Sequence, residues 1–435
     1  MSSTVISKKK RILVFPCGSE IGLEIHRSMQ FSTHFDLVGA SSVDDHGRFV
    51  YEDYIGDLPM HQHANFADAL LRIIDDRAID AIYPTMDAVA ETLQNLASKL
   101  GVRIIGSSQE TTAICASKSK TYAALAGLIP IPHIYNSLDE VTDYPIFIKP
   151  DRGYGARGAT RANNPEVALL ALKTASQQNM LIQEFLPGKE WTIDCFSDRH
   201  SKLRFHGVRS RGRISNGISV NTKPCSEFAS QFAQWAETIN QTLKPRGAWF
   251  FQAKLDKNDQ PKLLEVAARL AGSSALFRVK GVNFALLSAF DTFDQNIEIL
   301  INDFDIEMDR ALTNRFITNY EYTDVFVDLD DTLIVNGKVN YDLIAFLYKA
   351  INEGKRISLI TRHASDLSAT LKKHRLTLIF DRVIHATNGL SKADYIDVEK
   401  AVFIDDSFSE CIDIAHKLNI LSLETHSSTI FCHHY

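Results

Sequence analysis

Four carboxylates near the end of the chain follow two apolar runs, an arrangement that suits a divalent cation. Asp328 and Asp330 come directly after the run in VFVDLDDTL, and Asp405 and Asp406 close the run in AVFIDDSF. So much like charge would be costly in a structural site, whereas carboxylate oxygens are the ligands that Mg²⁺ prefers. The alternative is a pair of separate acidic turns on the surface. Two such motifs at strand ends in one small domain favour the metal site.

A second group of residues, in the middle of the chain, suits the phosphates of a nucleotide. The stretch PIFIKPDRGYGARG, residues 145–158, places Lys149 at the end of an apolar run and a glycine loop after it. The strand would fix the lysine, and glycines let backbone N–H groups approach a polyanion closely. A hairpin with a solvated basic turn is the alternative for this stretch alone. The loop residues concerned are Gly153, Gly155, Arg157 and Gly158, together with Arg152.

The acidic residues require a scaffold that brings distant segments together. Asp328, Thr361 and Asp405 each stand at the C-terminal end of an apolar run, with helical stretches such as YDLIAFLYKAIN between the runs. Strands that alternate with helices predict a parallel α/β sheet. Since the carboxyl ends of parallel strands meet at one edge of the sheet, we expect these three residues to share that edge.

The first hundred residues repeat this alternation. RILVF, DLVGAS, AIDAIYPTMD and GVRIIGSS read as strands, and FADALLRIID and AVAETLQNLASKL read as helices between them. The pattern predicts another parallel α/β sheet. Residues at or just beyond the strand ends are candidates for substrate contact: Asp44, Asp45, Pro84 and Asp87.

Length and composition limit the class of protein. A chain of 435 residues predicts roughly three domains. With 45% hydrophobic and 23% charged residues it has a globular composition, and its apolar runs are shorter than the roughly 18 residues that a membrane span requires. The N-terminal MSSTVISKKKR leads into a strand rather than a signal core, so we expect a cytoplasmic protein. The net charge of −6 argues against nucleic acid as a partner, and six cysteines without a CxxC pair argue against a zinc ribbon or a disulfide framework.

Five further elements occur in order along the middle of the chain. They are SKSKTY before LIPIP, FIKP with its glycine loop, LIQEFLPGKEWTID, a strand containing RSR, and FQAKLD followed by LLEVAARLAGS. In this order and at this spacing they resemble the ATP-grasp superfamily, in its carbamoyl-phosphate-synthetase-like branch, over about residues 1–315. The resemblance implies a Rossmann-like pre-ATP-grasp domain at residues 1–114 and an ATP-grasp domain at residues 115–318, with ATP held between two α+β lobes.

The resemblance also implies roles for individual residues. Phosphates would be bound by Lys118 and Lys149 and covered by the loop from Gly153 to Gly158. Adenine would meet Glu184, Phe185 and Leu186, and the ribose Glu190. Mg²⁺ would be held by Gln252 and Glu265, and the transferred phosphoryl group by Arg269 with Arg209 or Arg211. These roles are chemically consistent, because phosphoryl transfer depends mainly on positioning and charge neutralisation.

One position departs from the family pattern. Family members usually have Glu-x-Asn before the arginine, and this chain has Ala267 in the stretch from Glu265 to Arg269. Alanine has no side-chain oxygen, so one ligand of Mg²⁺ would be missing. Water or another residue could replace it, the site could hold a single metal ion, or the domain could bind ATP without turning it over.

The acidic motifs resemble the haloacid-dehalogenase-like (HAD) phosphatase superfamily over about residues 323–425, within a third domain at residues 322–435. The resemblance implies that Asp328 is the nucleophile that forms an aspartyl-phosphate and that Asp330 is the general acid and base. Thr361 and Lys392 would bind phosphoryl oxygens, and Asp405, with Asp406, would complete the Mg²⁺ site. The spacing from Thr332 through Thr361 to Lys392 leaves room for a helix and a strand but not for a cap domain.

These interpretations combine into a multidomain α/β and α+β protein with two enzymatic sites. We expect an ATP- and Mg²⁺-dependent carboxylate–amine ligase joined to a Mg²⁺-dependent HAD phosphatase. Its partners would be a small carboxylate, an amine and a phosphorylated metabolite. Two alternatives stay open: a small-molecule kinase paired with a phosphatase, and an ATP-sensing module that regulates the phosphatase.

Overall fold

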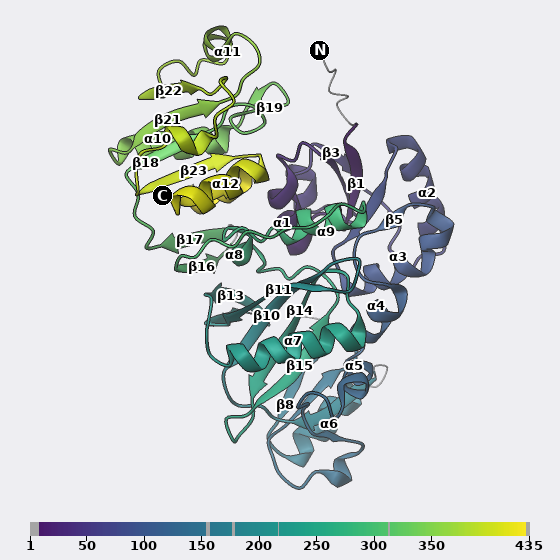
Figure 1. Ribbon diagram of the computed structural model, residues 1–435. Coiled ribbons are helices and arrows are strands. Elements are labelled where there is room, and N and C mark those ends of the chain that lie inside the picture. Colours follow the sequence, from purple (N-terminus) through teal and green to yellow (C-terminus); the bar gives the residue numbers. More distant parts are fainter. Residues whose placement is uncertain (1–7, 154–156, 176–178, 216, 312–313, 432–435) are drawn as a thin grey trace.

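The computed structural model describes the chain except for residues 1–7, 154–156, 176–178, 216, 312–313 and 432–435 (Figure 1). It is a mixed α/β structure built from several separate sheets. Among the described helices none is long and apolar enough to cross a membrane.

The first sheet is parallel and has the strand order β3-β2-β1-β4-β5. Alternate residues of β1 enter different cores: Leu13 packs with the helices α2 and α3, and Ile12 packs on the side of α1 and α9. This sheet is therefore buried on both faces, as parallel sheets usually are. Its elements are β1 (Lys10–Phe15), α1 (Glu20–Met29), β2 (Phe35–Ala40), the 3-10 helix η1 (His46–Phe49), β3 (Asp53–Ile55), α2 (Phe66–Arg77), β4 (Ala81–Pro84), α3 (Asp87–Leu100) and β5 (Arg103–Ile104), with α9 (Phe284–Thr292) added from later in the chain.

Two antiparallel sheets follow, and they carry the glycine loop and the predicted ligase residues. The smaller has the order β6-β9-β7-β8 and packs on α6, and the larger has the order β11-β10-β14-β15 and packs on α7. The elements are α4 (Gln109–Cys115), α5 (Lys118–Leu125), β6 (Ile134–Tyr135), η2 (Leu138–Glu140), β7 (Ile146–Pro150), β8 (Thr160–Ala162), α6 (Pro165–Thr174), β9 (Met180–Glu184), β10 (Glu190–Ser197), β11 (Leu203–Ser210), α7 (Ala229–Leu243), β14 (Gly247–Leu255) and β15 (Pro261–Ala267).

A further antiparallel sheet, with the order β12-β13-β16-β17, is absent from our sequence interpretation. Its strands are short, and β13 and β16 are separated by more than eighty residues, so no local pattern indicates that they pair. The elements are β12 (Arg213–Ser215), β13 (Ile218–Thr222), α8 (Ala275–Arg278), β16 (Ile306–Arg310) and β17 (Asn314–Thr318).

The last sheet is parallel, as the strand–helix alternation predicts, with the order β22-β21-β18-β23-β24. Besides the expected helix and strand, the segment between Thr332 and Thr361 holds a short hairpin of β19 and β20. No cap domain occurs between residues 332 and 392, all of which the structure describes. The elements are β18 (Asp324–Val327), β19 (Ile334–Val335), β20 (Lys338–Val339), α10 (Tyr341–Asn352), β21 (Arg356–Thr361), α11 (Leu367–Lys373), β22 (Arg382–His385), η3 (Lys392–Tyr395), β23 (Ala401–Asp405), α12 (Phe408–Leu418), β24 (Leu421–Glu424) and η4 (Thr425–Phe431).

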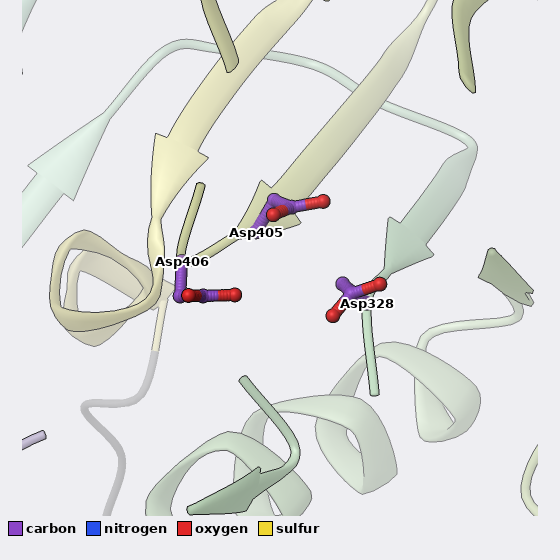
Figure 2. Close-up of side chains that lie close together, drawn as sticks. All are labelled: Asp328, Asp405 and Asp406. Atoms are coloured by element: carbon purple, nitrogen blue, oxygen red, sulfur yellow. The ribbon is translucent and has the colours of Figure 1, made fainter. Parts of the chain in front are cut away.

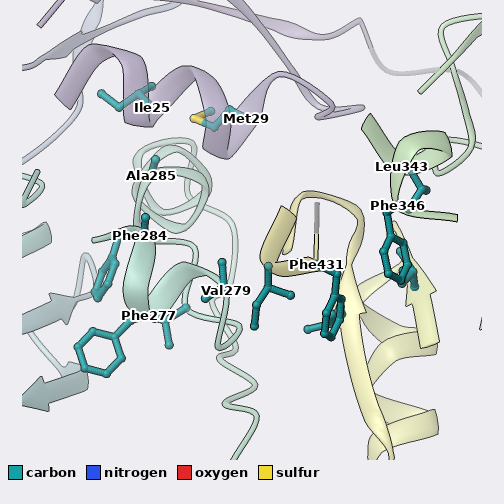
Figure 3. Packing of buried hydrophobic residues seen from close by; sticks show 14 of the residues in the cluster. Ile25, Met29, Phe277, Val279, Phe284, Ala285, Leu343, Phe346 and Phe431 are labelled. Carbon is teal, nitrogen blue, oxygen red and sulfur yellow. The ribbon is translucent and has the colours of Figure 1, made fainter. Parts of the chain in front are cut away.

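One hydrophobic cluster joins segments from the beginning, middle and end of the chain (Figure 3). Ile25 of α1, Phe277 of α8 and Phe431 of η4 all belong to it. Phe431 lies against the ring of Phe346 on α10, with 5.3 Å between ring centroids. The last sheet is thus packed against the rest of the molecule rather than attached by a free linker.

Candidate active sites

The larger antiparallel sheet has one apolar and one polar face, because successive side chains of a strand point to opposite sides. Trp191 and Phe251 belong to the apolar face and pack with α7. On the other face one row of paired residues crosses all four strands: Arg209 opposite Thr192, Thr192 opposite Gln252, and Gln252 opposite Glu265. The two side chains predicted to hold Mg²⁺, Gln252 and Glu265, are therefore direct cross-strand neighbours.

Two arginines of this polar face are held by carboxylates. Arg209 is 2% exposed, and its Nε and Nη2 donate to Asp194 over 2.6 and 3.3 Å. Its Nη1 has no hydrogen-bond partner among the described residues. Arg211 Nε lies 3.0 Å from Glu190, and Lys254 lies 3.6 Å from the same carboxylate. Glu190, the predicted ribose ligand, thus has two positively charged neighbours, Arg211 and Lys254.

Lys149 lies at the end of β7 and is buried. Its Nζ donates to the hydroxyl of Tyr122 over 3.0 Å, and that hydroxyl donates to the carbonyl of Leu264 on β15 over 2.6 Å. Burial, followed by the positive charge of Lys118, lowers the pKa of Lys149 to about 7. Lys118 itself starts α5 and donates to the carbonyl of Gly153 over 3.2 Å. Lys118 therefore lies close enough to Lys149 to lower the pKa of that lysine.

Two cavities meet beside the polar face. The first, of about 310 Å³, is lined by Arg209, Arg211 and Gln252, and we call it the arginine cavity. The second, of about 270 Å³, is lined by Lys118 and Gly153, and we call it the lysine cavity. Both are lined by Asp87, Ala88, Glu265 and Arg269. Arg269 donates to Asp87 over 2.8 Å, so the carboxylate at the start of α3 and the arginine after β15 form the boundary between the cavities.

The remaining predicted nucleotide ligands lie on or next to these sheets. Glu184 ends β9 and accepts a hydrogen bond from the backbone N–H of His133. The guanidinium of Arg161 lies over the ring of Phe185, 4.4 Å from its centroid, and Leu186 is buried. Arg157 and Gly158 are exposed, and Gly158 has a φ of +71°. Gly155 lies outside the described residues.

Tyr122, Asp194 and Thr192 are functional candidates that sequence reasoning missed. Thr192 and Asp194 could have been found from the segment EWTID. Side chains alternate between the two faces of a strand, so Glu190, Thr192 and Asp194 lie on the same face. Tyr122 could not be found in this way, since its contact with Lys149 joins a helix and a strand 27 residues apart.

The acidic residues of the last sheet converge at one edge, as expected (Figure 2). Asp328 follows β18, Asp405 ends β23 and Asp406 comes next, and one carboxylate oxygen of each lies within 4.8 Å of the others. Lys392 donates to Asp328 and to Asp405 over 2.6 Å each. Burial, followed by the charge of Asp405, raises the pKa of Asp328. Three hard oxygen ligands at this separation fit a divalent cation such as Mg²⁺.

Thr361 and Asp330 lie at the same edge. Thr361 ends β21 and is fully buried, and its hydroxyl accepts a hydrogen bond from the backbone N–H of His363. Asp330 is half-exposed and lies 2.8 Å from Nδ1 of His363. The second ring nitrogen of His363 is 2.9 Å from the hydroxyl of Thr370. The histidine thus holds Asp330 at the open side of the cluster.

Two further residues at this edge were not predicted. The hydroxyl of Thr332 donates to Asp406 over 3.2 Å and accepts from the backbone N–H of Asp406 over 2.9 Å. Glu424 ends β24 and pairs in register with Asp405, and burial raises its pKa to about 7. Thr332 could have been identified from its position in the DDTL motif. Glu424 could not, because it ends a strand without a second acidic residue beside it.

Part of the middle of the chain is similar to a known protein family. Residues 176–308 match the model of the family described as ATP-grasp in the biosynthetic pathway with Ter operon. D-alanine–D-alanine ligase of Thermotoga maritima is 30% identical over 145 residues, which are 32% of this chain and 48% of that protein. The chain therefore spans about half the length of this curated relative.

Solved structures show the same fold. A biotin carboxylase of Campylobacter jejuni, in a βγ-ATP complex, gives a TM-score of 0.58 at 15% identity, covering 69% of this chain and 75% of that one. N5-carboxyaminoimidazole synthetase of Staphylococcus aureus, complexed with ADP, gives 0.58 at 17% identity, covering 70% and 83%. Together these similarities support the ATP-grasp superfamily for this part of the chain.

Proposed function

We propose that the first three hundred residues bind ATP with Mg²⁺ and use it to join a carboxylate to an amine. The observation that carries the proposal is the junction of the two cavities at Glu265 and Arg269. ATP phosphates bound on the side of Lys118 and Lys149 would meet, at this junction, an acceptor held in the arginine cavity. The D-alanine–D-alanine ligase relative supports amide formation as the overall reaction.

In the proposed reaction a carboxylate oxygen of the acceptor attacks the γ-phosphorus, and the bond to the β–γ bridging oxygen breaks to release ADP. An amine then attacks the acyl carbon, phosphate leaves and the amine loses a proton. Lys118, Lys149 and Arg269 would neutralise the phosphate charge, which is the main requirement of phosphoryl transfer. Gln252 and Glu265 would hold Mg²⁺, which neutralises and orients the phosphates.

The nucleoside would occupy the space between the two antiparallel sheets. In this proposal the segment Glu184, Phe185 and Leu186 lies against adenine, Glu190 binds the ribose, and Gly153, Gly155, Arg157 and Gly158 cover the phosphates. Arg209 would contact the acceptor rather than the phosphates, because among the described lining residues it belongs to the arginine cavity and not to the lysine cavity.

For the last sheet we propose a phosphatase that resembles the HAD superfamily. Asp328 would attack a phosphate ester and form an aspartyl-phosphate while Asp330 protonates the leaving oxygen. Asp330 would then take a proton from the water that hydrolyses the intermediate. Thr361 and Lys392 would bind the phosphoryl oxygens. Asp405, Asp406 and Asp328, with Asp330 next to them, would hold Mg²⁺, which keeps Asp328 ionised and neutralises the phosphate.

Two activities and two variants test the proposal. ATP and Mg²⁺ with a carboxylate acceptor and hydroxylamine should release ADP and give a hydroxamate, because hydroxylamine traps acyl phosphates. Hydrolysis of p-nitrophenyl phosphate should report the second site. Asp328→Asn should abolish the hydrolysis and leave ADP release intact, and Lys149→Ala should do the reverse. Loss of both activities in either variant would refute two independent sites.

Ala267 favours one other function, an ATP sensor that regulates the phosphatase. Its side chain lies on the same face of β15 as Glu265, where an oxygen ligand would otherwise reach the metal. Binding of ATP without ADP release under any mixture of acceptors, combined with a phosphatase rate that changes with ATP, would favour the sensor. A stable phosphorylated product from one acceptor would instead favour a kinase.

A further inference from the structure

We propose that the arginine cavity binds the acceptor as a monocarboxylic acid with a compact apolar body, and that it excludes phosphorylated metabolites and sugar acids. The inference rests on the proposed function and names the substrate class of the same site. It is carried by the pairing of charges in the cavity, by one unpartnered donor and by the chemistry of the walls.

The charges that line the arginine cavity balance. Its described lining has three arginines, Arg209, Arg211 and Arg269, and three carboxylates, Glu20, Asp87 and Glu265. Each arginine is also paired, with Asp194, Glu190 and Asp87 respectively, and Glu20 is paired with Arg310. A ligand with two or more negative charges would therefore enter a site without surplus positive charge, and its desolvation would not be compensated.

The arginine cavity can nevertheless bind a single anionic group. Arg209 is 98% buried and lines the cavity, and its Nη1 has no hydrogen-bond partner among the described residues. A buried donor in this state is unfavourable until it meets an acceptor. The cavity wall also includes Thr85, Met86, Asp87 and Ala88, where α3 begins. This helix of 14 residues begins without a capping side chain, so its first N–H groups and its dipole also favour an anion.

Five apolar side chains also form part of the wall. Ile21, Met86, Ile218, Phe250 and Ala271 line the cavity. They come from α1, the start of α3, β13, β14 and the segment after β15. Such side chains stabilise an apolar body by removing it from water.

The hydroxyl groups of the lining are already used within the protein. Ser19 donates to Thr85, and Thr85 donates to the carbonyl of Pro16, each over 2.8 Å. Ser219 and Ser273 donate to the carbonyls of Asn221 and Ser219 over 3.3 Å. A polyhydroxylated acid would have to bury hydroxyls without matching partners, which is unfavourable.

The position of the monocarboxylate follows from the junction of the cavities. Its anionic end would lie between Arg209 and Arg269, beside Gln252 and Glu265, where the γ-phosphate is expected. Its apolar body would extend toward Ile21 and Ile218. Consequently the compound that the Asp328 site dephosphorylates is a different molecule from the acceptor of the ligase.

The experiment compares acceptors in the hydroxylamine assay with the full chain. Leucine, phenylalanine and 4-methylpentanoate represent apolar monocarboxylates, and phosphoserine, citrate and glucuronate represent the excluded classes. At least one apolar monocarboxylate should support ADP release at least tenfold faster than any of the other three. Faster turnover with phosphoserine, citrate or glucuronate would overturn the inference while leaving the ligase proposal in place. Absence of ADP release with all six acceptors would overturn both.

A pair of variants locates the effect in the cavity. Ile218→Trp fills the cavity from β13, where the side chain is 41% exposed and a larger group can be accommodated. It should raise the KM of the preferred acceptor at least tenfold and leave ATP binding unchanged. The control is Ile214→Trp on the neighbouring strand β12, which is 44% exposed and does not line the cavity, and which should leave both values unchanged. An unchanged acceptor KM in Ile218→Trp would contradict the assignment of this cavity.

Discussion

At the scale of single residues, Lys149 shows how burial prepares a phosphate ligand. The lysine has a hydroxyl partner, Tyr122, but no carboxylate that bonds to it directly among the described residues. Its positive charge is therefore poorly compensated until a polyanion arrives. Lys149 can therefore form ionic contacts with a bound polyanion rather than with a carboxylate of the protein.

The pKa of Lys149 leads to a testable pH dependence. Because burial and Lys118 lower this pKa to about 7, the free protein at pH 8 holds Lys149 largely neutral. ATP phosphates favour the charged form, so binding at pH 8 should take up roughly one proton, and affinity should fall as pH rises above 7. Calorimetry in two buffers of different ionisation enthalpy measures the uptake. Lys149→Met should remove it, and equal heats for the unchanged protein in both buffers would contradict the prediction.

Ala267 gives a second prediction at this scale. The residue is buried beside Phe250 and Ala271 and lines the lysine cavity. Ala267→Asn adds an oxygen beside Glu265 and should lower the Mg²⁺ concentration for half-maximal ADP release several-fold. Ala267→Val adds similar bulk without an oxygen and should not. If both variants respond alike to Mg²⁺, another group already completes the metal site.

At the scale of elements, the polar face of the larger sheet depends on its apolar face. Trp191, Phe232 and Trp249 are almost fully buried between the sheet and α7, and they fix the strands in register. A slip of one residue would turn the polar row into the core, so the packing on α7 specifies the alignment of Arg209, Thr192, Gln252 and Glu265.

The start of α10 links a helix cap to the acidic cluster. The side chain of Asn340 accepts from the backbone N–H of Leu343 and donates to the carbonyl of Thr332, whose hydroxyl holds Asp406. Asn340→Ala should destabilise the protein by about 1–2 kcal/mol. It should also raise the Mg²⁺ concentration that the phosphatase needs for half-maximal activity, because Thr332 loses its hydrogen bond from Asn340.

Asn164→Ala is the matched control for this prediction. Asn164 caps α6 in the same way, through the backbone N–H of Val167, but belongs to another sheet. It should cost stability and leave phosphatase activity unchanged. Equal Mg²⁺ responses in the two variants would show that Asn340 acts only as a cap.

At the scale of the whole molecule, the end of the chain is part of the central core. Arg278 of α8 donates to Glu24 of α1 over 2.7 Å and to the carbonyl of His426 in η4 over 3.3 Å. All three residues are buried. This contact joins the first sheet, the segment after β15 and the last sheet, so we expect the three predicted domains to unfold together.

Removing this contact tests that expectation. Arg278→Met removes the 2.7 Å ion pair with buried Glu24 and should destabilise the protein by about 3–5 kcal/mol. The thermal transition should stay single and move to lower temperature, with both activities lost together. Lys99→Met, which removes an exposed pair with Asp68, should leave the transition unchanged. Two separate transitions in calorimetry of the unchanged protein would contradict joint unfolding.

Local patterns were sufficient to predict the two parallel sheets and the acidic edge of the last sheet. Strand–helix alternation and strand-end positions are local properties, so Asp328, Thr361 and Asp405 could be placed together from the chain alone. The roles of these residues, and the limits of the three domains, remain predictions.

Contacts between distant segments could not be predicted in this way. The sheet of β12, β13, β16 and β17, the pair Arg209–Asp194, the Lys149–Tyr122 contact and the burial of η4 all depend on how separate elements pack. Such contacts are selected by the shape and burial of the complete core, which no single stretch of sequence contains. The junction of the two cavities at Glu265 and Arg269, on which the proposed chemistry rests, exists only in the folded molecule.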